Sequence, residues 1–411
     1  MIGTPKSLRL QIAIVGRVNS GKSSFLNLVS GQDVAVTSPQ RGTTTDVVEK
    51  AQELIPLGPV LWLDTAGTDD DSALGVERGR RTMQAVDRAD IMLLVTTPNV
   101  WGRDEERLLS AARERKIPVI PVVNKCDCEI CRPEFLKTVE ERCGTPAVTA
   151  VSSGDSAERD RVLNDLKQAL RAVAPEDFLV PPPLLGDLLP GRDGLVVMIV
   201  PIDLQAPKGR LILPQVQALR DGLDADAQVM VVKESQYVRA LGNFRDPPDL
   251  VVCDSQVVDF MVANTPAAIR CTTFSILLSR LKGDIVKLAS GVKAIDELRP
   301  GDRVLMAEAC THHATHEDIG RVKIPALLEK RAGGKLDFAF SGGRDFPDDL
   351  SSFKLIVHCG SCMLNRCETL RRIARAGAVP ITNYGMAISH CRGVLRRVLS
   401  PFPEALKALD R

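Results

Sequence analysis

The sequence predicts an α/β protein with mainly parallel sheets, divided into three domains. Apolar runs of strand length recur along the chain, and several lead through a polar loop into a segment with helical spacing. The chain has 411 residues, which is more than one hydrophobic core usually organises. A proline run at 181–183 marks a linker between domains.

Composition narrows the class of protein. Charged residues make up 26% and hydrophobic residues 44%, which is typical of a globular chain. A net charge of +1 and an aromatic content of 4% argue against nucleic acid or a membrane surface as a partner. Neither an apolar run long enough to span a membrane nor a signal peptide is recognisable, so we expect a cytoplasmic protein. Its eleven cysteines are then buried thiols or metal ligands rather than disulfides.

The first domain, residues 1–175, begins with a phosphate-binding loop. An alternating strand at 8–14 leads into a glycine-rich loop at 16–23, and a helix follows at 23–29. Backbone amides and the helix N-terminus hold phosphate oxygens in such a loop, while Lys22 neutralises their charge and Ser23 ligates Mg²⁺. The nucleotide contacts expected here are Gly16, Asn19, Ser20, Gly21, Lys22, Ser23 and Ser24.

Further motifs follow in a fixed order. An apolar strand at 60–63 ends in Asp64, which can hold the Mg²⁺ shell, and Gly67 can offer its amide to the γ-phosphate. A strand at 119–123 ends in Asn124-Lys125-Cys126-Asp127, where the Asp127 carboxylate accepts the two donors on the guanine edge and so selects GTP. A Gly-Thr-Thr-Thr-Asp segment at 42–46 suits a γ-phosphate-sensing switch. The remaining expected contacts are Thr44, Ser152 and Ser153.

These motifs resemble the GTPase superfamily, in the branch of tRNA-modification and ribosome-assembly GTPases. The resemblance implies GTP hydrolysis with Lys22, Thr44 and Gly67 at the catalytic centre, and Thr44 as a Mg²⁺ contact. It also implies activation by K⁺, which Asn19 marks in that branch. One departure is that no glutamine follows Gly67, so the residue that positions water is unassigned and intrinsic hydrolysis should be slow.

The second domain, residues 180–265, has no visible catalytic constellation. Strands are expected at 195–200, 229–232 and 250–252, with helices at 211–223 and 255–263. A unit this small gains stability by burying apolar area in a partner, which favours a dimerisation domain. A self-contained spacer is the alternative.

The third domain, residues 266–411, carries a candidate metal site. Cys310 follows a strand at 303–306, and Cys359 and Cys362 follow a strand at 354–357. Structural zinc would need a fourth ligand, His312 or His358, whereas an iron–sulfur cluster on three cysteines would leave one iron adaptable. Helices are expected at 272–281, 318–330 and 364–376. A second group with ligand spacing, Cys126, Cys128 and Cys131, starts inside the guanine motif, which constrains its first cysteine.

The Cys-x-His at 310–312, the His-Cys-x-x-Cys at 358–362 and the Thr-Asn-Tyr-Gly at 382–385 resemble the [FeFe]-hydrogenase maturation GTPases. The resemblance implies a homodimer with GTPase, dimerisation and iron–sulfur domains in that order. It implies a [4Fe–4S] cluster on the three cysteines, with His312 and His358 as candidate ligands. It further implies a scaffold that receives a diiron precursor from radical-enzyme partners and delivers it to apo-[FeFe]-hydrogenase. The alternative from the residues alone is an RNA-modification or assembly GTPase with a structural zinc domain.

Overall fold

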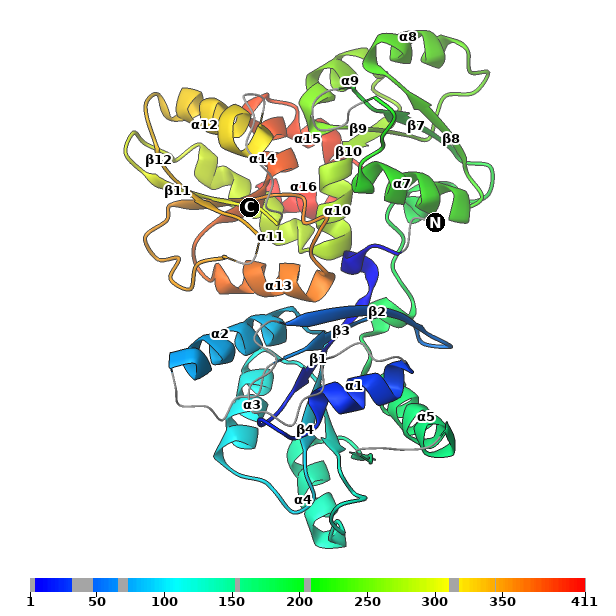
Figure 1. Ribbon diagram of the computed structural model, residues 1–411. Helices are drawn as coiled ribbons and strands as arrows, with labels where there is room; N and C mark the ends of the chain where they lie inside the picture. The colour runs from blue at the N-terminus through cyan, green and yellow to red at the C-terminus, as the bar shows by residue number, and fades with distance from the viewer. Residues whose placement is uncertain are drawn as a thin grey trace. The chain divides into compact units, whose positions relative to one another are not determined.

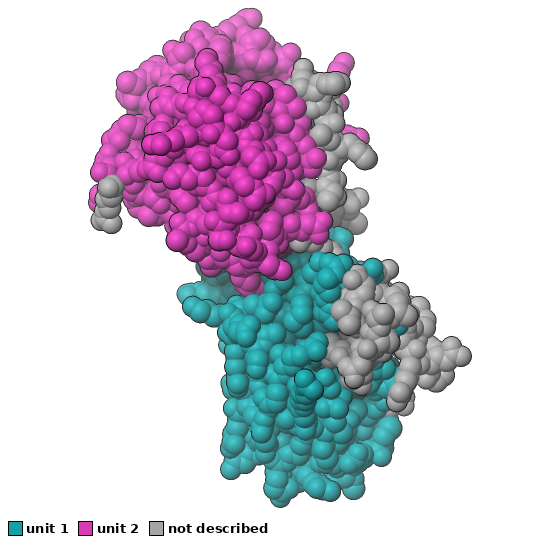
Figure 2. All heavy atoms as spheres, turned by 90° about the vertical axis from the view of Figure 1, so that its left-hand side faces the viewer, with its two compact units in different colours: residues 1–181 teal, residues 182–411 magenta. Residues whose placement is uncertain are grey.

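The computed structural model describes residues 4–31, 47–65, 73–151, 156–202, 208–309, 318–343 and 345–410. The chain divides into two compact units, Met1–Pro181 and Pro182–Arg411, which Figure 2 shows in separate colours. Among the helices of the described residues, none combines the length and apolar character needed to cross a bilayer.

The first unit is built on a six-stranded sheet with the order β2-β3-β1-β4-β5-β6 (Figure 1). β2 runs antiparallel to β3, and β3, β1, β4, β5 and β6 run parallel to one another. The strand β1 is buried at every position, as expected of a parallel strand covered on both faces. The strands are β1 (Leu10–Val15), β2 (Val48–Leu54), β3 (Gly58–Asp64), β4 (Ile91–Thr96), β5 (Val119–Val123) and β6 (Val148–Thr149).

Helices cover both faces of this sheet, and alternate residues of β1 point to different layers. Ile12 packs in one apolar cluster with Phe25 and Leu166, whereas its neighbour Ala13 packs in another with Leu108. The strand therefore carries the first glycine of the phosphate loop out of a sheet that is fixed from both sides. The helices are η1 (Lys6–Leu8), α1 (Lys22–Ser30), α2 (Ala73–Arg88), α3 (Arg103–Glu114), α4 (Pro133–Cys143), α5 (Ser156–Val173) and α6 (Glu176–Leu179).

The second unit contains two parallel four-stranded sheets with the same topology. Their orders are β8-β7-β9-β10 and β12-β11-β13-β14, so in each sheet the second strand of the chain comes first, followed by the first, third and fourth. The strands are β7 (Leu195–Ile199), β8 (Gln228–Val232), β9 (Leu250–Cys253), β10 (Arg270–Thr273), β11 (Arg303–Ala307), β12 (Asp337–Ser341), β13 (Leu355–His358) and β14 (Ile381–Asn383). The helices are η2 (Gly186–Leu188), α7 (Leu213–Asp224), α8 (Glu234–Gly242), η3 (Ser255–Val257), α9 (Val258–Asn264), α10 (Phe274–Lys282), α11 (Ile285–Gly291), η4 (Val292–Ile295), the π-helical turn η5 (Ile319–Lys323), α12 (Ile324–Ala332), α13 (Arg366–Arg375), α14 (Tyr384–Cys391), α15 (Leu395–Val398) and α16 (Pro403–Asp410).

Each of the two sheets packs against a helix that comes from the other sheet's part of the chain. α10 follows β10 and contacts α14, which follows β14. The next helix on each side then packs on the other sheet: α11 lies on β14, and α15 lies on β10 (Figure 1). A single hydrophobic core includes residues of both sheets, such as Val251 and Ile356. We call the two halves, each with one of these sheets, the first and second copy.

Most of the predicted strands are confirmed, but one segment that was predicted as a helix begins with a strand. The helix predicted at 272–281 begins only at Phe274, because the preceding residues form the strand β10. This strand pairs with β9, so the first copy continues past residue 265, where the sequence analysis ended the second domain. The strands β2, β4, β12 and β14 were also not predicted.

Candidate functional site

The glycine-rich loop connects the end of β1 to the start of α1. Gly16 and Gly21 have φ angles of 152° and 88°, where side chains are strongly disfavoured. A Cβ atom on Gly16 would lie 2.1 Å from the carbonyl oxygen of Val95, and one on Gly21 would lie 2.2 Å from Asn124 Nδ2. Asn19 also has a left-handed backbone, with φ of 62°. Such a compact turn suits the close approach of phosphate oxygens to the backbone.

The Lys22 side chain is buried and folds back over this loop. Its Nζ donates hydrogen bonds to the carbonyl oxygens of Gly16, at 3.1 Å, and Arg17, at 2.7 Å. The positive charge is therefore held inside the loop that would receive the phosphates.

Sequence analysis missed an ion pair that fixes the outer side of the loop. The guanidinium of Arg17 donates two hydrogen bonds, both of 2.7 Å, to the Glu105 carboxylate of α3. Glu105 is 1% exposed and also accepts the amide of Gly102 at the start of that helix. No local pattern marks this pair, because its members are far apart in sequence.

Ser23 and Asp64 form the part of the site that fits a magnesium ion. Ser23 Oγ donates to Asp64 Oδ2 at 2.7 Å. Asp64 Oδ1 is buried and has no hydrogen-bond partner in the described part of the chain. Burial raises the pKa of this carboxyl, while the Ser23 hydrogen bond and the Lys22 charge act in the opposite direction. A divalent cation here would satisfy the orphaned oxygen and favour the carboxylate.

The guanine motif begins next to the phosphate loop. Asn124 is fully buried, and its Nδ2 donates to the carbonyl oxygens of Ser20, at 3.1 Å, and Gly21, at 3.3 Å. Lys125 has a left-handed backbone with φ of 66°, and Asp127 lies exposed beyond it. The loop that would read the base is thus tied to the loop that would hold the phosphates.

The structure brings together the predicted nucleotide contacts on two loops and one strand end. These are Gly16, Asn19, Ser20, Gly21, Lys22, Ser23 and Ser24 on the first loop and the start of α1, Asp64 at the end of β3, and Asn124, Lys125 and Asp127 after β5. The predicted contacts Thr44, Gly67, Ser152 and Ser153 lie outside the described residues.

A second candidate site lies where β11 and β13 end side by side. Ala307 is paired with His358, and the amide of Cys359 donates to Ala307 O at 2.8 Å. Ala309 returns a hydrogen bond from its amide to Cys359 Sγ at 3.1 Å. Cys310, the next residue after Ala309, lies outside the described residues, as does His312. The chain leading to Cys310 therefore runs directly past the Cys359 thiol.

His358 is buried at the base of the cysteine turn, which we define as residues 359–364. Its Nδ1 donates to the carbonyl oxygen of Cys359 at 2.9 Å and lies 3.3 Å from Ser361 Oγ. Burial, assisted by the charge of Arg372, lowers the pKa of His358 to about 4, so the imidazole is neutral. Nε2 then keeps its lone pair and has no hydrogen-bond partner among the described residues. A neutral imidazole nitrogen of this kind fits a metal ligand.

Cys362 lies on this turn, and the side chain of Lys282 faces it. Burial raises the pKa of the Cys362 thiol, and the charge of Lys282 acts against that rise. Lys282 is itself 2% exposed, and burial lowers the pKa of its amine to about 8. Its Nζ donates to three backbone carbonyl oxygens of the turn, at Ser361, Cys362 and Leu364.

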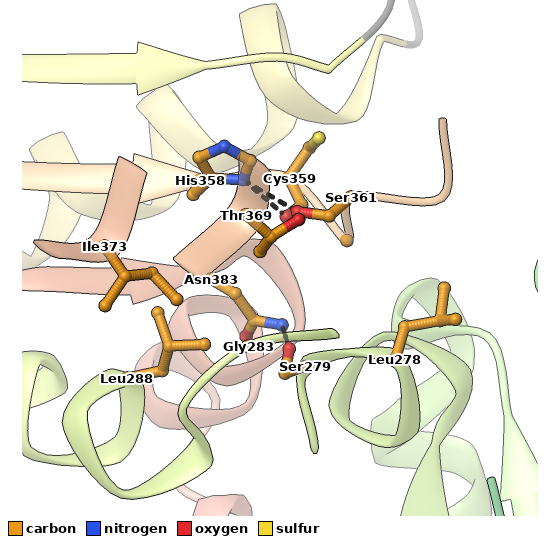
Figure 3. Close-up of a pocket in the computed structure, with 11 residues that line it drawn as sticks. Leu278, Ser279, Gly283, Leu288, His358, Cys359, Ser361, Thr369, Ile373 and Asn383 are labelled. Carbon is orange, nitrogen blue, oxygen red and sulfur yellow. Dashed lines mark hydrogen bonds between the residues drawn. The ribbon is translucent and has the colours of Figure 1, made fainter. Parts of the chain in front are cut away.

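A pocket opens beside this turn and encloses about 260 Å³, its open mouth included. Figure 3 shows His358, Cys359 and Ser361 on one side, with Asn383 and Ser279 on another. Leucine and isoleucine side chains complete the lining, so the pocket is mixed in character. The enclosed part of this hollow is small, with room for about one water-sized group beside Cys359.

The described residues alone do not complete a metal site. No group of three or more histidine, cysteine or acidic side chains that could hold a metal ion occurs among them. For the cysteine turn, the remaining predicted ligands, Cys310 and His312, lie outside the described ranges. Cys126, Cys128 and Cys131 are all described and still form no such group; Cys126 Sγ instead donates to Val123 O.

Comparisons with known proteins agree with the class that the first site defines, a P-loop GTPase. Residues 11–125 match the family described as 50S ribosome-binding GTPase. The tRNA modification GTPase MnmE of a Synechococcus species is 42% identical over 152 residues, which cover 35% of this chain and 31% of that protein. MnmE of a Nostoc species is 42% identical over 123 residues, 29% of this chain and 26% of that protein. The chain thus spans less than a third of the length of these relatives.

Era from Aquifex aeolicus is 21% identical, with a TM-score of 0.36, covering 56% of this chain and 98% of that one. Residues 11–125 are therefore a P-loop GTPase domain.

The second unit identifies the family. Residues 184–283 match the hydrogen maturase F dimerization domain, and residues 286–401 match the hydrogen maturase F tetramerization domain. These two matches together cover more than half of the chain, which belongs to the hydrogen maturase F family. The family descriptions indicate oligomerisation through both regions, whereas the sequence analysis assigned it only to the first.

Replacing Asp127 with asparagine should change the base that the GTPase prefers. An amide presents a donor where the carboxylate accepted two guanine donors, so GTP should bind more weakly and xanthosine triphosphate, with its 2-oxo group, more tightly. Competition binding of the two nucleotides to Asp127→Asn and to the native chain measures this exchange. Equal turnover of ATP and GTP by the native chain would contradict the role of Asp127.

Proposed function

We propose that this GTPase is a scaffold and carrier for hydrogenase maturation. It holds a [4Fe–4S] cluster in its second unit, receives a diiron precursor from radical-enzyme partners and delivers the precursor to apo-[FeFe]-hydrogenase. GTP hydrolysis in the first unit times this transfer.

The observation that carries the proposal is the position of the cysteine turn within a hydrogen maturase F chain. Cys359 and Cys362 lie on one short turn, and the strand beside it leads directly to Cys310. Thiolates are soft ligands suited to iron–sulfur clusters, and three of them leave one iron with an adaptable position. The neutral His358 offers an unpaired nitrogen close by. When bound, the cluster supplies an iron to which cargo attaches; the protein's part is to hold it and to shape the adjoining pocket.

Metal analysis of anaerobically purified protein tests this function. We expect iron and sulfide in cluster proportions, a brown colour, and activation of apo-hydrogenase when the partner-loaded protein is added. Stoichiometric zinc in a colourless protein would instead support the alternative, an RNA-modification or assembly GTPase with a structural zinc domain.

We further propose that K⁺ activates GTP hydrolysis through Asn19. The left-handed backbone of this residue keeps it on the tight part of the phosphate loop, where its side-chain oxygen can bind a cation beside the phosphates. Hydrolysis should be faster in K⁺ than in Na⁺, and Asn19→Ala should remove the difference. Steady-state rates in the two salts at equal ionic strength measure the effect, and a native enzyme indifferent to the cation would contradict it.

We also propose that the chain forms a homodimer along the β8 edge of the sheet of the first copy. β8 is the last strand of that sheet, and Met230 and Val231 on it are 37% and 40% exposed. Val216 and Leu223 on the neighbouring α7 add exposed apolar surface. An edge strand with apolar neighbours is suited to pairing with a second copy of itself. Light scattering should give a mass that is an even multiple of the chain mass, and a monomer would exclude this assembly.

A further inference from the structure

The two copies in the second unit match in detail at the helix that follows their fourth strand. Thr273 and Asn383 each cap that helix, accepting the amides of Ile276 and Met386. At the same interval further on, the hydroxyls of Ser279 and Ser389 each donate to the carbonyl oxygen four residues earlier, both at 2.7 Å. Three residues later each copy has a basic residue followed by glycine: Lys282-Gly283 in the first copy and Arg392-Gly393 in the second.

Each of these basic residues reaches across to the other copy. Lys282, from the first copy, bonds the turn that follows the third strand of the second copy. Arg392, from the second copy, bonds Gln256 O (3.2 Å) on the corresponding turn of the first copy and Asp259 (2.7 Å) on the helix α9 that follows it. The contacts are reciprocal, but only the turn held by Lys282 carries cysteines.

The Lys282 ammonium group uses its full hydrogen-bonding capacity within this turn. An ammonium has three donors, and here all three find carbonyl oxygens of one turn, at 3.2 Å for Ser361, 3.1 Å for Cys362 and 2.8 Å for Leu364. Ser361 has a left-handed backbone, with φ of 57°, that an unrestrained turn would rarely keep. Carbonyl dipoles that converge on one point repel each other, and a buried cation removes that repulsion.

We propose that Lys282 is the positioning residue of the cysteine turn: the first copy supplies the buried cation that fixes the backbone at Ser361, Cys362 and Leu364 and sets a positive charge beside the thiolates of Cys359 and Cys362. The inference rests on the proposed cluster-binding role of this turn. It gives the first copy a part in cluster binding besides dimerisation.

The test compares Lys282→Met, Lys282→Arg and the matched control Arg392→Met, each as the full chain. Hydrogen exchange of the amides at 359–366 in iron-free protein reports on the turn alone, and it should be faster in Lys282→Met than in the native chain. Circular dichroism verifies folding; if the methionine variant does not fold, Lys282→Gln, which keeps donors without the charge, takes its place.

The cluster provides the second readout. Loss of an outer ligand-supporting contact typically costs 10–100-fold in metal affinity, so Lys282→Met should lose iron to a chelator about 10-fold faster than the native protein. Its cluster should also have a lower reduction potential, because a nearby positive charge favours the reduced, more negative form. Lys282→Arg should recover most of both properties, and Arg392→Met should match the native protein in each.

The outcomes separate this inference from the proposed function. A native protein without iron would overturn the cluster role, yet faster exchange of the turn in Lys282→Met would still support positioning by Lys282. Native rates of exchange and iron loss in Lys282→Met would overturn the inference while the cluster role stands. Equal losses in Arg392→Met would also overturn it, because they would indicate general destabilisation of the interface between the copies.

Discussion

Replacing Cys359 with alanine should remove the iron–sulfur cluster and abolish hydrogenase activation, while GTP hydrolysis stays near the native rate. The thiol of Cys359 lies at the junction of β11 and β13 and accepts the amide of Ala309. A cluster on three cysteines that loses one of them keeps only two thiolate ligands, too few to hold it. The GTP contacts lie in the first unit, on other elements of the chain, and are unchanged by the substitution.

The measurement combines iron content, the electron paramagnetic resonance spectrum, GTPase rate and hydrogenase activation for each variant. Cys391→Ala is a matched control, because this cysteine lies on α14 and its thiol, with a pKa raised by burial to about 11, is expected to be an unligated core group. His358→Ala should act more mildly and alter the spectrum more than the iron content. Full hydrogenase activation by the Cys359→Ala protein would refute the carrier role.

Replacing Lys22 with alanine should lower the rate of GTP hydrolysis by about 10²–10³-fold, since removal of one preorganised group that stabilises transition-state charge costs that much. The Nζ atom is held by the carbonyl oxygens of Gly16 and Arg17, so its position in the loop does not depend on a bound nucleotide. The other basic residue of this loop, Arg17, is bound to Glu105, so it does not replace the charge that Lys22 offers to the transferred phosphate.

Single-turnover hydrolysis, with nucleotide binding measured separately, distinguishes lost chemistry from lost affinity. Lys137→Ala is the control, because that lysine is exposed on α4 and pairs only loosely with Glu141, at 4.0 Å. A Lys22→Ala enzyme that keeps a tenth or more of the native rate would contradict the assignment, because that loss is only about 10-fold or less.

The sequence predicted best those parts of the fold whose structure follows from the residues of one short segment. The buried strand β1 is apolar at every position except Gln11, and the loop after it needs glycines because of its backbone angles and close contacts. The contacts around Asp64 and Asn124 follow from the parallel sheet, whose strands end at one edge. The proposed ligands Cys359 and Cys362 were likewise visible because their spacing is local.

The contacts missed by sequence all join distant segments. β10 was read as the start of a helix, because Thr272 and Thr273 give a short strand little apolar signal before the helix begins. Lys282 lies at the end of an amphipathic helix, where a lysine usually faces water, and its carbonyl partners are in the other copy. Arg17 and Glu105 are separated in the same way. Burial of a charged group depends on what packs against it, which the spacing of one segment does not encode.

The crossed helices of the second unit also determine where this protein can be divided. A polypeptide that ended at Gly283, where the first family match stops, would expose β10 by losing α15, and it would deprive the remaining chain of the Lys282 contacts. A separation after Pro181 follows the boundary between the two compact units. Heat or denaturant should therefore melt residues 182–410 in one cooperative step. During evolution the first unit could be gained or replaced independently, whereas the two copies of the second unit would have to be inherited together.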